Sequence, residues 1–392
     1  MRFSLLTTLA LAASANAAII FVGSYGGQIH SVNLNDSTGA LTLLSSTSAS
    51  APDPSWQETS PVAKDILYTV EERASGNYSL GAVTSYRIGS NGALTKLFST
   101  TQMGGPVSMT VSPNGKMIVT ASYVGGGVTA FTANPSTGSI TFLKDFTYTL
   151  SAPGAVPERQ EAPHPHQALF DATGKYVLVP DLGADLIRIY GVSGAQLTEL
   201  QPVAVTPGTG PRHGMFWPKT GTPKYYYLVG EIVNSVLVYE VSYSSAGIAL
   251  KLVQTISTLP TPTSGTPPST TSAAPWTTPS AGEIAISPDG ETIYVSNRND
   301  KVFIATTGTD SVATYSTTDE GLLELLEIID AKVSTPRHIA VDPKGKWFIT
   351  EGQSSADMFV FKRDADGTVV DAPVASLAVA GGPVCVTWSR KT

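Results

Sequence analysis

Histidine residues recur in three short motifs of this chain, and two of these motifs also contain an arginine. His164-Pro165-His166, Arg212-His213 and Arg337-His338 contain four of its five histidines. An imidazole accepts or donates a proton near neutral pH, and a guanidinium holds a carboxylate or phosphate through two parallel hydrogen bonds. The combination indicates a site that binds an anion and transfers a proton beside it.

Other polar residues stand directly before or after short apolar runs. Glu283 precedes such a run, and the residues that follow one are Tyr25, Glu71, Glu72, Tyr123, Asp181, Glu231, Asn297, Arg298 and Glu351. We predict that the loops carrying these residues meet at the mouth of one channel. A structural role competes with this interpretation, because Arg212 and Arg337 each follow a proline in a repeated pattern and could pair with a buried acid.

We predict no metal ion and no cofactor. Two histidines separated by one residue on an extended strand point to opposite faces, so His164 and His166 do not readily share one ion. No set of ligands with fixed spacing accompanies them. One of the two could instead bond the backbone of a neighbouring repeat.

Similar turns divide the chain into units of about 50 residues. The turns are Ser112–Gly115, Asp171–Gly174, Ser287–Gly290 and Asp342–Gly345, with a looser copy at Pro218–Gly221. Each lies between two apolar runs, for example Gln167–Phe170 and Tyr176–Val179, which is typical of a β-hairpin. A third and a fourth run follow, so each unit predicts four short antiparallel strands, the blade of a β-propeller.

The two ends of the chain indicate a closed ring. Two further units precede the first clear turn, which makes seven. The chain starts with what is elsewhere a second strand, Ile19–Gly23, and finishes with what resembles a first strand, Gly382–Trp388. A ring joins such ends in one blade, whereas an open solenoid needs capping repeats. We therefore predict an all-β, seven-bladed propeller over residues 18–392, with a Pro/Ser/Thr-rich inserted loop at 258–279.

Composition narrows the class of protein. Hydrophobic residues make up 42% and charged residues 14% of the chain, and its net charge is −7. A large core is therefore expected, and a nucleic-acid partner is not, because phosphate binding needs a basic face. The single cysteine, Cys385, excludes an intrachain disulfide. We expect a monomer.

The N-terminus predicts export. An apolar run over residues 3–13 leads into Ala15-Asn16-Ala17, which is typical of a cleaved signal peptide covering residues 1–17. The run is too short to span a bilayer, so we expect a secreted protein without a membrane anchor. Asn35 and Asn77 begin sequons that N-glycosylation could use.

The ordered motifs resemble those of the seven-bladed lactonase family. The motifs are Pro163–Gln167, Leu178–Asp185, Gly210–His213, Val229–Glu231, Ser287–Gly290, Tyr294–Arg298 and Thr335–His338. The resemblance covers essentially the whole mature chain. The family includes cycloisomerase-type 6-phosphogluconolactonases and 3-carboxy-cis,cis-muconate lactonizing enzymes. It implies a metal-free site with one histidine, two arginines and one glutamate, which fall here on the His164/His166 doublet, Arg212, Arg298 and Glu231.

The resemblance implies an enzyme that opens or forms the lactone of an acidic or polyhydroxylated small molecule. Arg212 and Arg298 would bind a carboxylate and stabilise developing oxyanion charge, while the histidine doublet and Glu231 would serve as acid and base. The residues that we expect to contact the substrate are Tyr25, Tyr123, Asp181, His213, Glu283, Arg337 and His338.

Two other hypotheses stay open at this point. An exported propeller could bind carbohydrate or protein without catalysis, using Tyr25, Tyr123 and Trp276 for stacking on sugars. A metal-dependent, gluconolactonase-like enzyme is the other. This chain also departs from the family pattern, because it resembles an exported protein and has Gly230 where we expect Asn.

Overall fold

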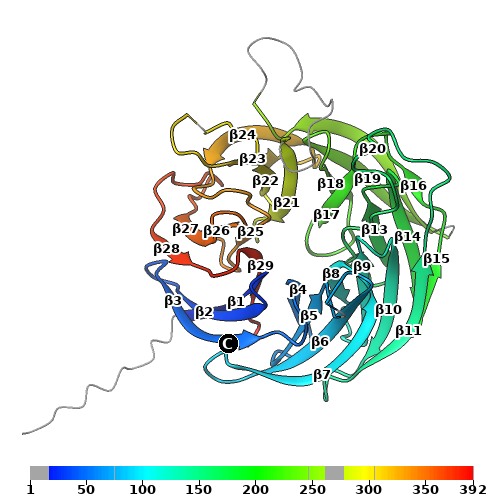
Figure 1. Cartoon of the computed structure of the whole chain (residues 1–392). Coiled ribbons are helices and arrows are strands. Elements are labelled where there is room, and N and C mark those ends of the chain that lie inside the picture. The colour runs from blue at the N-terminus through cyan, green and yellow to red at the C-terminus, as the bar shows by residue number, and fades with distance from the viewer. Residues whose placement is uncertain (1–16, 75, 246, 261–277, 304, 392) are drawn as a thin grey trace, which may run out of the picture.

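The described residues form 29 strands in seven sheets that surround a central axis (Figure 1). The computed structural model describes residues 17–391 except 75, 246, 261–277 and 304. None of the described residues is helical. No membrane-spanning helix occurs among the described residues either. The all-β, seven-bladed propeller predicted from the turns is confirmed.

The N- and C-terminal strands share one blade, as predicted. In that blade β29 (Pro383–Trp388) pairs with β1 (Ala17–Ser24), followed by β2 (Gln28–Asn35) and β3 (Leu41–Ser48). The register places Val386 opposite Val22 and Trp388 opposite Ile20. Both are apolar pairs within the blade, so ring closure also buries hydrophobic surface.

The other six blades are each built on four consecutive antiparallel strands, and one of them has a fifth. The second blade has β4 (Pro54–Thr59), β5 (Ile66–Glu71), β6 (Leu80–Ile88) and β7 (Leu94–Met103), and the third has β8 (Pro106–Val111), β9 (Met117–Ser122), β10 (Gly127–Ala133) and β11 (Ile140–Thr147). The fourth has β12 (Leu169–Phe170), β13 (Tyr176–Asp181), β14 (Leu186–Ser193) and β15 (Gln196–Glu199), with β16 (Val203–Ala204) also on β14. The fifth has β17 (Pro211–Trp217), β18 (Tyr225–Gly230), β19 (Ser235–Ser244) and β20 (Gly247–Ser257), and the sixth has β21 (Ser280–Ile286), β22 (Thr292–Arg298), β23 (Ser311–Thr317) and β24 (Leu323–Asp330). The seventh has β25 (His338–Val341), β26 (Trp347–Gly352), β27 (Asp357–Lys362) and β28 (Ala375–Ala378).

The repeated turns join the first two strands of a blade. In the last copy, Asp342 Oδ1 accepts hydrogen bonds from the backbone N–H groups of Lys346 and Trp347, and Gly345 has a φ of 73°. Glycine adopts this left-handed conformation without a Cβ clash, whereas other residues are strained there. The recurring Asp/Ser and Gly of the sequence motif are therefore the residues that close each hairpin.

The first strand of the fourth blade is shorter than its sequence indicates. We expected a strand at Gln167–Phe170, and only Leu169–Phe170 pairs as β12. Upstream, Pro165 forms an isolated bridge with Asp181, and the N–H of His166 donates to Pro180 O at 2.9 Å. Proline lacks an N–H and so cannot continue the ladder. The histidine doublet still runs beside β13, in an irregular extended segment.

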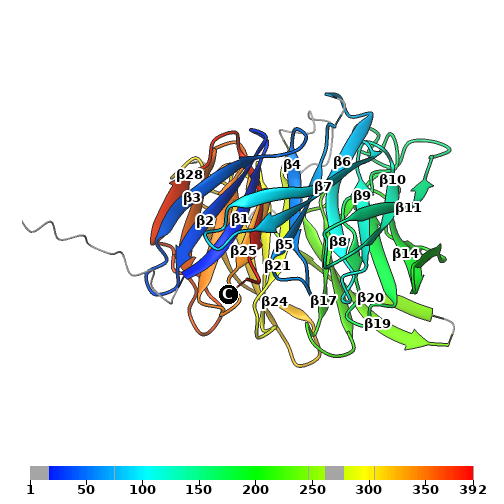
Figure 2. The same ribbon diagram turned by 90° about the horizontal axis from the view of Figure 1, so that it is seen from below.

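Apolar side chains pack between neighbouring blades. In one such cluster Val229 and Val238 of the fifth blade meet Ile284 and Val295 of the sixth, all at most 3% exposed. Figure 1 shows the first strands nearest the axis and the fourth strands at the rim, and Figure 2 shows the same ring from the side. Polar loops at the inner strand ends can therefore converge at the centre. Most of the predicted signal peptide, the middle of the predicted insertion and Trp276 lie outside the described residues.

Candidate active site at the mouth of the central channel

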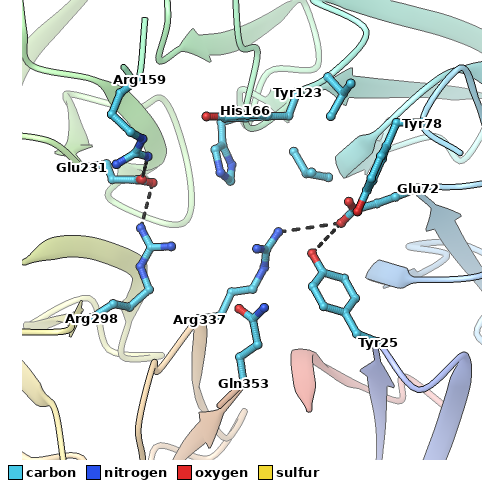
Figure 3. A pocket seen from close by; sticks show the side chains of 12 residues that line it. Tyr25, Glu72, Tyr78, Tyr123, Arg159, His166, Glu231, Arg298, Arg337 and Gln353 are labelled. Carbon is cyan, nitrogen blue, oxygen red and sulfur yellow. Dashed lines mark hydrogen bonds and ion pairs between the residues drawn. The ribbon is translucent and has the colours of Figure 1, made fainter. Parts of the chain in front are cut away.

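A cavity of about 320 Å³ opens where the predicted loops converge (Figure 3). Its lining residues come from six blades and the long β11–β12 connection. They are Tyr25, Glu72, Tyr78, Val107, Tyr123, Val124, Arg159, His166, Glu231, Arg298, Arg337 and Gln353. Six of the twelve sequence-predicted catalytic or substrate-contacting residues are among them: Tyr25, Tyr123, His166, Glu231, Arg298 and Arg337. The volume suits a small-molecule ligand.

Bulges in the first strands position several of the predicted site residues. The register shifts between Pro211 and Gly214 in β17 and between Ala281 and Ile284 in β21. Equivalent shifts occur in β4 and β8. An extra residue in a strand bends it and redirects its side chains, which is why bulges are common beside active sites. Arg212, His213 and Glu283 lie within two of these bulges.

Glu231 is a buried carboxylate held by three guanidinium groups. Its Oε2 forms ion pairs with Arg298 Nη2 at 2.8 Å and Arg212 Nε at 2.9 Å, and its Oε1 contacts Arg159 Nη2 (Figure 3). Burial alone would raise its pKa, but the charges of Arg298, Arg159 and Arg212 hold the pKa well below its ordinary value. A carboxylate that stays ionised cannot donate a proton near neutral pH. The geometry thus favours an anchoring role over the acid or base role that the resemblance implied.

Arg212 lies deeper than the cavity lining. It is 1% exposed and its Nη1 donates to Gly282 O at 2.9 Å, in addition to the Glu231 ion pair. Burial, followed by the charge of Arg298, lowers its pKa to about 9. The structure thus brings the two expected arginines to one carboxylate, Arg298 facing the cavity and Arg212 behind it.

Arg337 differs from the other three arginines. Among the described residues its nearest carboxylate oxygen is Glu72 Oε1 at 3.9 Å, and its guanidinium lies 5.4 Å from the centre of the Tyr25 ring. Tyr25 Oη donates to Glu72 at 2.7 Å. The guanidinium of Arg337 is therefore available to a ligand, since none of the described side chains lies within hydrogen-bond distance of it.

The histidine doublet separates into two environments. His164 Nδ1 lies 2.9 Å from Tyr123 O, its Nε2 lies 3.0 Å from Glu161 Oε1, and its ring stacks on Tyr123 at 4.1 Å. His166 instead lines the cavity, with Nδ1 3.0 Å from His213 Nε2. No described residue bonds its Nε2. His166 is therefore the member of the doublet placed to contact a substrate.

Four residues that we expected to contact the substrate do not line the cavity. His213 Nδ1 lies 2.9 Å from Glu283 Oε2, and both side chains are buried behind His166. His338 Nε2 lies 3.8 Å from the same oxygen. Asp181 accepts the backbone N–H of His164 at 2.7 Å and pairs with Arg188 inside the fourth blade.

Arg159 and Tyr78 line the cavity and were missed from the sequence. Arg159 lies in the long β11–β12 connection, outside the repeated strands and turns. This connection is anchored by Gln160, whose Nε2 donates to Leu182 O at 2.9 Å and Asp185 Oδ2 at 2.8 Å. The three charged residues within 158–161, in an otherwise apolar and Pro-rich segment, were the only available signal. Among the described residues no group of three His, Cys, Asp or Glu side chains is arranged to hold a metal ion.

Glu351 is fully buried, and neither carboxyl oxygen has a hydrogen-bond partner among the described residues. Burial raises its pKa well above the ordinary value of 4.5, and the charge of Arg337 only partly opposes this. The folded protein therefore keeps this proton to a higher pH than the unfolded chain does.

We expect Glu351→Gln to flatten the pH dependence of stability. Above pH 4.5 the unfolded wild type loses this proton while the folded protein retains it, so stability falls by up to about 1.4 kcal/mol per pH unit until the folded pKa is passed. The amide has no proton to lose. Thermal melts from pH 5 to 8 should therefore show a smaller decline for Glu351→Gln than for the wild type. Parallel declines would mean that Glu351 is already ionised in the folded protein.

Comparisons with known proteins agree with this fold. The family described as "Lactonase, 7-bladed beta-propeller" matches residues 19–388. A protein of Arthroderma benhamiae described as a probable 6-phosphogluconolactonase is 42% identical over 373 residues, covering 94% of this chain and 88% of its own. The 6-phosphogluconolactonase of Bacillus subtilis is 29% identical over 327 residues, covering 82% and 84%.

A solved structure shares the architecture. The periplasmic gluconolactonase of Pseudomonas aeruginosa aligns with a TM-score of 0.81 at 23% identity, covering 96% of this chain and all of that one. At this identity the likeness concerns the fold. The family match and the fungal relative carry the assignment further: the chain belongs to the seven-bladed β-propeller lactonase family and is a lactonase-type enzyme.

Proposed function

We propose that this enzyme hydrolyses the lactone of a sugar acid that carries a second anionic group, with 6-phosphoglucono-δ-lactone as the representative substrate. The observation that carries the proposal is that His166 and the available guanidinium of Arg337 line one cavity. The relatives described as 6-phosphogluconolactonases support the same substrate class. The charges favour an anion, because four arginines surround two carboxylates, Glu231 and Glu72.

The proposed reaction begins with His166 as general base. Its Nε2 takes a proton from a water molecule, whose oxygen attacks the lactone carbonyl carbon. The guanidinium of Arg298, fixed by Glu231, provides positive charge for the oxyanion that forms. The bond from the carbonyl carbon to the ring oxygen then breaks, and the ring oxygen takes the proton back from His166. Arg337 holds the second anionic group through charge-assisted hydrogen bonds.

The proposal includes export of the enzyme. The apolar run at residues 3–13 and the small-residue pattern that follows support a signal peptide. Asn77 is exposed, with its Oδ1 accepting the N–H of Ser79 at 3.0 Å, and its neighbour Tyr78 lines the cavity. Asn35 is half-buried and caps a turn after β2. A glycan on Asn77 would stand beside the cavity mouth.

The test compares a phosphorylated and an unphosphorylated lactone. We expect the wild type to hydrolyse 6-phosphoglucono-δ-lactone with a lower KM than glucono-δ-lactone, equally well with and without EDTA. Arg337→Ala should raise the KM for the phosphorylated lactone about tenfold or more, because bonds to charged groups are worth about 1.5–3 kcal/mol, and should leave the KM for glucono-δ-lactone nearly unchanged. A pH-indicator assay measures both.

The matched control is Arg87→Ala. Arg87 pairs with Asp65 at 2.6 Å on the surface of the second blade and does not line the cavity. This variant should behave like the wild type on both lactones. Equal KM values for the two lactones in the wild type would contradict the anionic substrate class, and loss of activity in EDTA would indicate a metal-dependent reaction instead.

A further inference from the structure

We propose that Glu283 and His213 are positioning residues that act through His166, forming a carboxylate–imidazole–imidazole relay that sets the tautomer of the general base and receives its positive charge. The three side chains come from neighbouring blades: Glu283 from β21, His213 from β17, and His166 from the segment that precedes β12. The relay extends the proposed function to two residues that do not line the cavity.

The contacts along the relay are short and buried. His213 Nδ1 lies 2.9 Å from Oε2 and 3.0 Å from Oε1 of Glu283, and His213 Nε2 lies 3.0 Å from His166 Nδ1. The three side chains are 2–6% exposed. Burial lowers the pKa of both histidines, so both are neutral near pH 7. Burial opposes ionisation of Glu283, but the neighbouring histidines and Arg212 hold its pKa at about 2.

These contacts determine where each proton lies. An ionised carboxylate only accepts hydrogen bonds, so Nδ1 of His213 carries a proton and donates it to Glu283. Nε2 of neutral His213 is then an acceptor. Nδ1 of His166 therefore carries a proton and donates to that acceptor. The lone pair of His166 is left on Nε2, the atom without a partner among the described residues.

The relay also answers an electrostatic problem at His166. Burial and the charges of Arg212, Arg337 and Arg298 all disfavour a protonated His166. As Nε2 takes a proton from water, the Nδ1 proton of His166 can move to Nε2 of His213. Two N–H bonds form and one N–H bond and one O–H bond break, so the proton count balances. The positive charge then lies on His213, in contact with the Glu283 carboxylate and farther from the cavity.

Packing holds the relay in line. The ring centres of Trp56 and His213 lie 5.3 Å apart in an edge-on arrangement, and those of Tyr123 and His166 lie 5.5 Å apart in the same arrangement. The backbone N–H of Glu283 donates to Ser296 Oγ at 2.9 Å. These contacts restrict the orientation of the three side chains, as general-base catalysis requires. His338 lies near the same carboxylate, at 3.8 Å, and its Nδ1 accepts the N–H of Val386 at 3.4 Å, which places it outside the relay.

The first test reads the tautomers without any substrate. The chain has five histidines, so ¹⁵N-labelled imidazoles can be resolved and assigned through single His→Gln variants. At pH 7 we expect both His166 and His213 of the wild type to carry their proton on Nδ1. A proton on Nε2 of His166 would overturn the relay, whether or not the enzyme hydrolyses lactones. Absence of lactone hydrolysis with the expected tautomers would overturn the proposed function instead.

The second test is a double-mutant cycle on 6-phosphoglucono-δ-lactone. Glu283→Gln should lower kcat about 10- to 100-fold, as loss of the carboxylate that orients a metal-bound histidine does, with little change in KM. Glu283→Asp should recover part of this loss. In a His166→Asn background Glu283→Gln should change kcat less than twofold, because a residue that acts through another has no effect once that partner is gone. Equal effects in both backgrounds would show that Glu283 acts independently of His166.

Glu58→Gln is the control for the same substitution in a first strand, at a partly buried carboxyl outside the relay. Glu58 lies in β4, its Oε2 accepts the N–H of Val111 at 3.3 Å, and it does not line the cavity. Burial raises its pKa to about 8, so the amide replaces a neutral group at pH 7. This variant should keep the wild-type kcat. A kcat loss equal to that of Glu283→Gln would mean that the loss reports on the fold.

Discussion

We expect His166→Asn to lower kcat for lactone hydrolysis by a factor of about 10² to 10⁴, the usual contribution of a positioned general base. Asparagine has similar width and can still bond His213, but its amide does not accept a proton. The Tm should stay within a few degrees of the wild type, because His166 contributes no ion pair to the fold. Initial rates and thermal melts on the same preparation measure both quantities.

His164→Asn is the comparison that distinguishes the two histidines. His164 bonds Tyr123 O and Glu161 and stacks on the Tyr123 ring, so its loss should lower the Tm. The kcat of His164→Asn should fall much less than the kcat of His166→Asn. The opposite order of kcat losses would assign the base to His164.

The pH dependence of kcat/KM should show the lowered pKa of His166. Burial and then the charge of Arg212 lower the pKa of His166 below 6.5. A base acts only when unprotonated, so activity should be constant above pH 6.5 and fall as the pH drops through this lowered pKa. If activity falls on acidification with a midpoint above pH 6.5, the assignment of His166 as the general base is contradicted.

The second large effect concerns stability. We expect Glu231→Gln to destabilise the protein by about 3–5 kcal/mol, because removing one partner of a buried ion pair leaves an uncompensated charge. Here three guanidiniums, of Arg159, Arg212 and Arg298, lose their shared counter-ion at once. Urea unfolding followed by tryptophan fluorescence measures the loss.

Added anions sharpen this test. Sulfate or phosphate can enter the cavity and neutralise the exposed faces of Arg159 and Arg298, so the anion should raise the Tm of Glu231→Gln more than that of the wild type. Glu240→Gln is the matched control, because Glu240 is an exposed carboxylate 3.9 Å from Lys251. A Glu231→Gln variant as stable as Glu240→Gln would exclude the anchoring role.

The direction in which Glu231 makes stability depend on pH follows from its lowered pKa. The stabilisation that it provides is present above its unfolded pKa of about 4.5 and is lost as the pH falls toward the lower folded value. The wild type should therefore lose stability below pH 4.5 more steeply than Glu231→Gln does.

The ring was predictable because its determinants are local. Turns such as Asp342–Gly345 need Gly at a positive φ and an acceptor side chain at the first position, and both are visible in sequence. Ring closure followed from the incomplete first and last units. The length of β12 was not predictable from apolar periodicity, because the prolines at 163 and 165 interrupt the ladder.

The site was only partly predictable because it depends on packing between blades. Alternation along an extended strand separates His164 from His166, but it does not say which one faces the cavity. Arg159 reaches Glu231 across 72 residues from a connection without repeat character. The relay likewise joins three blades, and no spacing within one blade encodes the 3.0 Å contact between His166 and His213.

The measurement that tests the central claim most directly is the rate of 6-phosphoglucono-δ-lactone hydrolysis by the wild type in EDTA, with His166→Asn as the blank. Spontaneous opening of the lactone is subtracted through the blank. We expect saturable, EDTA-resistant hydrolysis by the wild type and a rate about 10² to 10⁴ times lower for His166→Asn. Wild-type rates that equal the blank would contradict the proposed function.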